Sequence, residues 1–193
     1  GRAVSYQRVV NYWGAQLPVN RGRHNFESIR IDYYRDDTVA LEAFKAREYD
    51  WRFENTAKVW AKSYDGLAVE TGLIQKVNIA HEEPTGLSAF VFNLRRPIFG
   101  DRRVREALGL AFDYEWTNKN LFFGAYTRTR SYFSNSELAS SGLPSRAELA
   151  LLEPYRGRIP EEVFIREFVP PKTDGSGKIR RNLRAANKLL NAA

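Results

Sequence analysis

The sequence predicts an α/β fold with a mixed sheet flanked by helices, and three observations lead to this prediction. Segments with the apolar–polar alternation of β-strands are separated by segments with helical spacing, as between residues 29 and 53. Turn residues such as glycine and proline stand between these segments. With 193 residues, of which 43% are hydrophobic and 27% charged, the composition is that of an ordinary globular domain with its own core.

The first part of the chain predicts a β-α-β unit. Residues 3–10 and 29–34 alternate as strands do, and residues 49–53 form a further strand candidate that is rich in aromatic side chains. Between the second and third strands, Asp36 offers oxygen atoms that can accept hydrogen bonds from free backbone N–H groups. Apolar residues then recur at helical spacing over 39–44. A helix between two parallel strands predicts a right-handed crossover.

The middle of the chain predicts one short helix and two more strands. Asn55 or Thr56 can cap a helix that follows directly. Residues 73–80 and 87–93 are the strand candidates, and the turn residues at 84–86 separate them. These two strands complete the predicted mixed sheet.

The remainder of the chain predicts four helices and one long loop. Asp101 opens a helix whose apolar residues fall on one stripe, namely Val104, Ala107, Leu108, Ala111 and Phe112. Further helices are predicted over 115–123, 146–153 and 178–191. Residues 125–144 are polar, aromatic and rich in serine, with little periodicity. This composition predicts a long ordered loop of the kind that often carries function.

Composition and motifs argue against catalysis, metal binding and cofactor binding. The chain has no cysteine, which excludes a disulfide scaffold and a thiolate metal site. The two histidines, His24 and His81, lie far apart in different predicted loops, and no nucleotide-binding or nucleophile-elbow motif is present. Two acidic pairs are explained by a helix start at 36–37 and a turn at 82–83. We therefore expect a protein that is not an enzyme and needs no cofactor or metal.

Charge and hydropathy restrict the class of partner. The formal net charge is +7, yet the Lys and Arg residues are spread along the chain with no run of five or more. This distribution predicts a solvated basic surface. No apolar run approaches the roughly 18 residues of a membrane-spanning helix, so direct membrane insertion is not expected. Neither end of the sequence resembles a natural terminus, and we expect a fragment of a longer protein.

Aromatic and basic side chains alternate between residues 126 and 133. Such a segment can stack on bases and neutralise phosphates, as in proteins that bind nucleic acid. It can equally line a peptide cleft in which arginine binds carboxylates, or it can simply pack a long loop onto the protein. No RNP-type motif or zinc knuckle accompanies it, so the sequence favours a peptide partner over nucleic acid. The residues are Tyr126, Arg128, Arg130, Tyr132 and Phe133.

Residues 90–113, FVFNLRRPIFGDRRVREALGLAFD, resemble the family 5 extracellular solute-binding proteins. The shared pattern is a strand ending in Phe-Asn, a Pro-Phe turn, Asp-x-x-Val-Arg-x-Ala, and a helix ending in Asp. All parts are present in order. Arg47 departs from the family, which usually has a glycine there that suits a left-handed helix end. The likeness extends toward the YejA-like subfamily over nearly the whole chain, through residues 11–14, 17–23, 33–38, 42–46, 131–138 and 173–177.

The resemblance implies one lobe of a type II periplasmic-binding-protein fold, in which two lobes close on a ligand around a hinge. Residues 1–193 would form much of a single C-terminal lobe, and the N-terminal lobe would be absent. The resemblance also implies a periplasmic (extracytoplasmic) protein that captures oligopeptides in the interlobe cleft and delivers them to the membrane permease of an ABC importer. Its partners would be the peptide, the permease and the missing N-terminal lobe.

Six residues are candidates for contact with the peptide. In open α/β lobes, ligands bind beyond the carboxyl ends of parallel strands, which selects the segments that follow the predicted strands. Two asparagines are expected to hydrogen-bond to peptide backbone groups, one of two arginines to meet a carboxylate, and two tyrosines to pack against ligand side chains. In that order the candidates are Asn55 and Asn93, Arg128 and Arg130, and Tyr126 and Tyr132.

Two alternative functions remain open at the level of sequence. The same fold could serve a receptor for murein-derived or otherwise modified peptides, and sequence does not separate this from a general oligopeptide receptor. An alternative from another class is a basic nucleic-acid-binding module, which would bind oligonucleotides with a strong dependence on salt.

Overall fold

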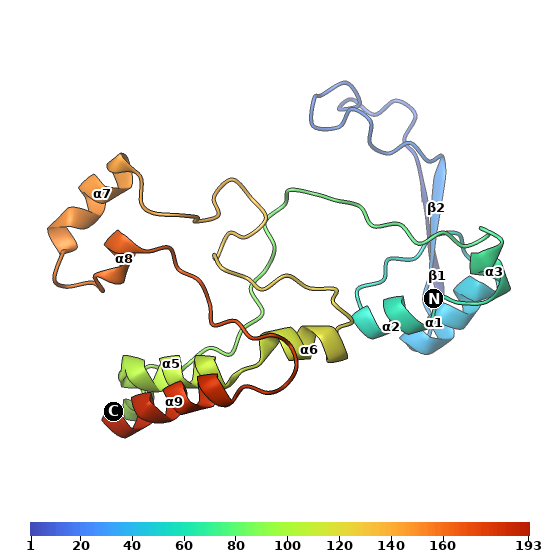
Figure 1. The fold of residues 1–193 in the computed structure, drawn as a ribbon. Coiled ribbons are helices and arrows are strands. Elements are labelled where there is room, and N and C mark those ends of the chain that lie inside the picture. Colours follow the sequence, from blue (N-terminus) through green and yellow to red (C-terminus); the bar gives the residue numbers. More distant parts are fainter. The chain divides into compact units, whose positions relative to one another are not determined.

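The computed structural model describes all 193 residues, and the chain divides into two compact units. The first unit comprises residues 1–54 and 65–75, and the second comprises residues 55–64 and 76–193. Figure 1 labels the helices and strands of both units.

A two-stranded antiparallel sheet and two helices make up the first unit. Strand β1 (Ala3–Gln7) pairs with β2 (Ser28–Asp32) from one end of each strand to the other. Asp36 opens helix α1 (Asp37–Lys45), because its carboxylate accepts a hydrogen bond from the Val39 backbone N–H at 2.9 Å. Helix α3 (Leu67–Glu70) completes the unit.

Arg47 adopts, at the end of α1, the left-handed conformation that a glycine at this position would suit. Its φ is +64°. Its backbone N–H donates to the Phe44 carbonyl at 3.0 Å, and the Glu48 N–H donates to the Ala43 carbonyl at 3.0 Å. Glycine is favoured at such helix ends, so arginine keeps the turn at a local conformational cost of about 1 kcal/mol.

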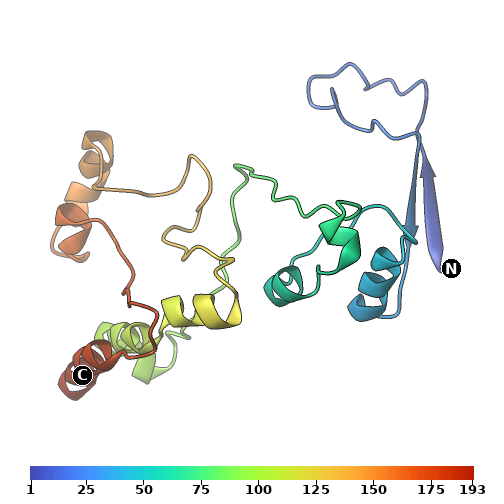
Figure 2. The same cartoon turned by 45° about the vertical axis from the view of Figure 1, so that its right-hand side comes forward.

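Helices joined by long irregular segments make up the second unit. Its largest contact is between α5 and α9, which lie side by side in both ribbon views (Figures 1 and 2). Ala107 on α5 and Ala186 on α9 are only 1% and 5% exposed, which makes this helix pair the core of the unit. The elements in chain order are α2 (Ala57–Lys62), α4 (Pro97–Gly100), α5 (Arg102–Ala111), α6 (Tyr114–Leu121), α7 (Arg146–Leu152), η1 (Glu153–Tyr155), α8 (Glu162–Ile165) and α9 (Arg180–Ala192).

Polar side chains begin three helices of the second unit where the sequence predicts helices. The Asp101 carboxylate accepts from the Arg103 backbone N–H at 2.8 Å, and hydrogen bonding from Arg103 lowers the pKa of that carboxyl to about 2. Asp113 accepts from the Trp116 N–H at 3.0 Å at the start of α6. Ser145 forms a reciprocal capping box at the start of α7. Each cap satisfies a backbone donor that the helix leaves free.

Three of the predicted strands are absent from the structure. Residues 49–53, 73–80 and 87–93 have no strand pairing, so the predicted β-α-β unit does not form and the only sheet is the antiparallel β1–β2 pair. Alternation specifies an extended backbone, whereas a strand also needs a neighbour whose N–H and C=O groups complete the ladder. No segment within these 193 residues provides that neighbour. The α/β class is confirmed, and the strand predictions for these three segments are wrong.

Candidate functional site

All six predicted ligand contacts lie in the second unit, and four of them share one loop at residues 125–136. The loop begins directly after α6, where the Asn118 side chain holds its first turn. Asn118 Nδ2 donates to the Tyr126 carbonyl at 2.6 Å, and the Tyr126 N–H donates to Asn118 Oδ1 at 3.1 Å. The Tyr126 ring meets the Phe122 ring edge-on, with centroids 5.1 Å apart. Tyr126 is therefore fixed by α6 while 47% of it stays exposed.

Arg128 is engaged within the protein. Its Nη1 donates to the Pro171 carbonyl, and its guanidinium carbon lies 5.3 Å from the centroid of the Tyr114 ring. Burial raises the pKa of the Tyr114 hydroxyl, and the positive charge of Arg128 acts in the opposite direction. The side chain is half-buried and ties the loop to the segment before α9. A ligand carboxylate would have to compete with these contacts.

Arg130 and Tyr132, by contrast, are exposed. Arg130 has no hydrogen bond or ion pair, and the Tyr132 side chain is 80% exposed with no hydrogen bond to its hydroxyl. A free guanidinium offers a planar fork of donors that matches a carboxylate. A free tyrosine offers a large apolar face with a polar tip. Of the four loop residues, these two have the freedom to meet a ligand.

The two predicted asparagines lie at the starts of helical turns. Asn93 Oδ1 accepts from the Arg95 N–H at 3.1 Å, and the amide donors of its side chain remain available to a ligand. Asn55 is exposed and immediately precedes Thr56, the N-cap residue of α2. No hydrogen bond joins the side chain of either asparagine to the 125–136 loop.

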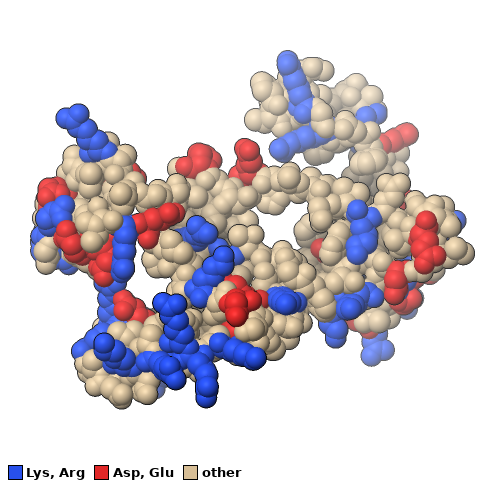
Figure 3. Space-filling model, viewed as in Figure 1, with Lys and Arg blue, Asp and Glu red and all other residues tan.

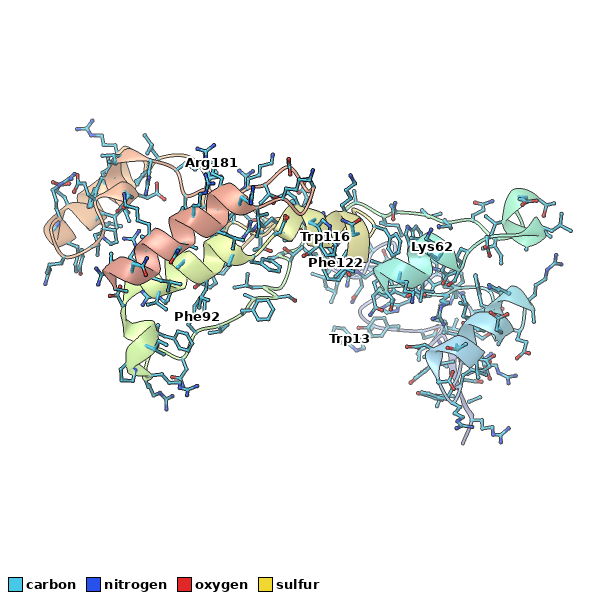
Figure 4. The ribbon with its side chains drawn as sticks, turned by 60° about the horizontal axis from the view of Figure 1, so that its bottom comes forward. Trp13, Lys62, Phe92, Trp116, Phe122 and Arg181 are labelled. Carbon is cyan, nitrogen blue, oxygen red and sulfur yellow. The ribbon has the colours of Figure 1, made fainter.

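A hydroxyl between two carboxylates holds residues 171–177 against the start of α6. Thr173 Oγ1 lies 2.5 Å from Asp113 Oδ1 and 3.1 Å from Glu115 Oε2, and the Thr173 N–H donates to Glu115 Oε2 at 3.0 Å. Gly175 and Gly177 follow with φ of +71° and +78°. A Cβ on Gly177 would lie 3.1 Å from the ring of Trp116, the α6 residue labelled in Figure 4. This junction gives the Thr-Asp-Gly-Ser-Gly motif a structural role that sequence reasoning missed.

Asn135 fastens the far end of the loop to the segment at residues 81–85. Its Nδ2 donates to the His81 carbonyl at 2.8 Å and to the Glu83 carbonyl at 2.9 Å. The neighbouring Ser134 carbonyl accepts from the Thr85 N–H at 2.9 Å. Asn135 has φ of +65°, a conformation that asparagine tolerates better than most residues. Sequence reasoning missed this residue as well, and its only sequence signal is that tolerance.

Replacement of Asn135 by alanine is expected to speed amide hydrogen exchange at the Thr85 N–H by about tenfold, which corresponds to roughly 1.4 kcal/mol. Alanine removes both side-chain donors and is strained at a positive φ. Asn135→Gly is the matched variant, because glycine loses the same donors without the strain and should therefore show a smaller increase. Unchanged exchange in both variants would contradict the anchoring role.

A shallow hollow of about 430 Å³ lies along α6. It is lined by Tyr114, Glu115, Asn118, Lys119, Phe123 and Gly124. None of the six predicted contacts lines it, although Asn118 both borders the hollow and holds the start of the loop. The hollow therefore adjoins the predicted site through Asn118.

The structure contains no cluster of three or more His, Asp or Glu side chains that could hold a metal ion. No helix has the length and hydropathy needed to cross a bilayer.

The family model described as "Bacterial extracellular solute-binding proteins, family 5 Middle" matches residues 1–193. The resemblance stated from sequence is thereby confirmed. The match covers the whole chain, including the loop at 125–136 and the junction at 171–177.

Individual relatives agree with this match. The chain is 51% identical over 193 residues to "Uncharacterized protein YejA" of Escherichia coli (strain K12), covering all of this chain and 32% of the relative. It is 38% identical over 195 residues to "Probable peptide-binding protein YejA" of Agrobacterium fabrum, again 32% of that protein. "Peptidoglycan-binding protein YepA" of the same organism is 35% identical over 201 residues, 33% of its length. The chain thus spans about a third of the length of these relatives.

Proposed function

The chain belongs to the bacterial extracellular solute-binding proteins of family 5, and from this premise we propose that the protein is the substrate-binding component of a peptide ABC importer. The match of the family model over the whole chain carries the proposal, and the name of the peptide-binding relative supports it. The family is one of binding proteins. The protein would capture oligopeptides outside the cytoplasmic membrane, in the periplasm, and pass them to the permease.

Residues 1–193 would contribute much of the C-terminal lobe, and the cleft would be completed by an N-terminal lobe elsewhere in the full-length protein. The exposed side chains of Arg130 and Tyr132 on the 125–136 loop are the best placed to reach the peptide. Asn118, Arg128 and Asn135 would hold that loop in shape. The amide donors of Asn93 would complete the contacts to peptide backbone carbonyls.

The mass of the ligand that co-purifies with the full-length protein tests the proposal. Native mass spectrometry of protein purified without denaturant is expected to show adducts that dissociate as peptides. Their removal by unfolding and refolding should create empty sites that calorimetry can titrate with a peptide library. An adduct that is a sugar, a nucleotide or a metal complex, together with no heat from the library, would refute the peptide assignment.

A second candidate is a receptor for murein-derived or otherwise modified peptides on the same fold. The name of the peptidoglycan-binding relative, 35% identical over 201 residues, is the observation that favours it. The same mass measurement separates the two candidates, because murein peptides contain D-amino acids and diaminopimelate whose fragments differ from those of ordinary peptides.

A further inference from the structure

Helix α9 presents an unusual row of unpaired cations. Its sequence, RRNLRAANKLLNA, contains four basic residues and no acidic residue. On an ideal helix, Arg180, Arg184 and Lys188 follow one another at four-residue steps of about 6 Å, and Arg181 lies beside them within the same arc of about 100°. All four side chains are exposed, and none forms a salt bridge or a hydrogen bond. We refer to these four residues as the α9 basic row.

On the neighbouring helix α5, the cationic side chains have partners within the protein. Arg102 pairs with Glu106 at 2.5 Å, and Arg103 pairs with Asp101 at 2.5 Å. Arg105 donates to the Phe99 carbonyl at 2.6 Å. Every arginine of α5 therefore has an internal partner, whereas the α9 basic row has none. The contrast holds between these two packed helices, since other exposed arginines of the unit, such as Arg130 and Arg146, also lack a partner.

The position of the row on α9 is unfavourable for the helix itself. Arg180 and Arg181 occupy the first turn, where the helix macrodipole disfavours positive charge, and the N-cap residue Ile179 offers no side-chain hydrogen bond. The four like charges also repel one another along about 12 Å of helix. Local rules broken without internal compensation commonly mark functional positions.

The opposite side of α9 is already occupied. Ala186 is 5% exposed in the contact with α5, and Figure 4 shows Arg181 pointing away from that contact. Figure 3 shows Lys and Arg side chains gathered over the region of α9, at the lower left of the view. Ala186 thus faces α5, although Leu183 and Leu190 of the same helix remain 47% exposed. The α9 basic row therefore lies on the side of α9 that does not contact α5.

We propose that the α9 basic row is a docking surface for a partner protein that presents Asp or Glu side chains in a line. A single helix carries the charges as a line, which fits a rod-like acidic helix with carboxylates at four-residue spacing, whereas a flat lipid surface would be met best by cations spread over several elements. Three of the four residues are arginines, whose planar guanidinium groups bind carboxylates through two parallel hydrogen bonds. Such a row would mainly steer association and set orientation. The proposal does not depend on what ligand the 125–136 loop binds.

The test compares two triple variants of the full-length protein that lose the same charge. Arg180→Gln, Arg184→Gln and Lys188→Gln together remove most of the α9 basic row. Arg2→Gln, Arg8→Gln and Arg23→Gln remove three exposed, unpaired cations of the first unit. The probe is a fluorescent helical peptide with Glu at every fourth position, and a peptide with Gln at the same positions is its control. Binding is measured by anisotropy over a range of salt concentrations.

The α9 triple variant is expected to bind the Glu peptide at least about tenfold more weakly and with a flatter salt dependence, while the first-unit variant changes by less than about twofold. Equal losses in both variants would assign the effect to net charge and overturn the proposal. A fall in the thermal midpoint of the α9 variant alone, with unchanged peptide binding, would show that the row pairs inside its own protein. Wild-type binding to phosphatidylglycerol vesicles or a short DNA duplex, but not to the Glu peptide, would also overturn it.

Discussion

Replacing Arg130 by alanine in the full-length protein is expected to weaken the binding of peptides with a free carboxylate by about 1.5–3 kcal/mol, roughly 10- to 150-fold in Kd. The guanidinium is exposed and has no partner in the protein, so its loss should leave the free energy of unfolding unchanged. Amidated peptides of the same sequence should lose little affinity, because they lack the charge that Arg130 would meet. Calorimetry with the acid and amide forms of one peptide measures the difference.

Arg128→Ala serves as the matched comparison and should behave differently. It removes a donor from the Pro171 carbonyl and a cation from the face of the Tyr114 ring. We expect the free energy of unfolding to fall by about 1–2 kcal/mol. The affinities for the acid and the amide peptide should fall by similar factors, because the whole loop loses its support. If neither variant changes the affinity for peptides, neither arginine contacts the ligand. If Arg128→Ala discriminates acid from amide at unchanged stability, Arg128 contacts the ligand directly.

Helix positions were predictable because their signals are local. Asp36, Asp101 and Ser145 each stand one residue before a helix and accept a hydrogen bond from the first turn, as their residue types predict. The family could also be predicted, since residues 90–113 carry a pattern long enough to be specific. Both kinds of signal are read without knowing which distant segments meet.

Sheet pairing was not predictable, because it depends on partners that the alternation of one segment does not specify. Residues 73–80 and 87–93 alternate as strands do, yet no segment of this chain pairs with them. Large apolar residues there stay open to solvent, with Ile79 at 77% and Val91 at 87% exposed. Apolar side chains exposed to this extent indicate a surface that another segment or another protein normally covers.

The support of the 125–136 loop and the junction at residues 171–177 were missed for a related physical reason. Asn118, Asn135 and Thr173 act through side-chain hydrogen bonds to groups 8, 54 and 60 residues away in the sequence, respectively. Polar residues of these types are common in any loop, so the sequence does not distinguish an anchoring asparagine from a solvated one. The arginines and tyrosines predicted on the loop have distinctive chemistry, whereas Asn118, Asn135 and Thr173 are of residue types common in any loop.

Ala107→Leu is expected to lower the free energy of unfolding by about 1–3 kcal/mol in the full-length protein. Ala107 is 1% exposed in the α5–α9 contact, where a small side chain lets the two helices approach closely. The larger side chain would force them apart and so would also displace the α9 basic row. Alanine and leucine both favour helices, so the effect should come from packing and not from helix propensity.

Ala111→Leu provides the control on the same helix. Ala111 is exposed, so the same substitution there should change the free energy of unfolding by no more than about 0.5 kcal/mol. Urea unfolding followed by far-UV circular dichroism measures the free energy of unfolding of both variants, and equal m-values make the two free energies comparable. Equal stabilities for the two variants would mean that α5 and α9 do not pack as a closed pair in solution. In that case α9 would be free to rotate, and the outward orientation that the α9 basic row requires would lose its physical basis.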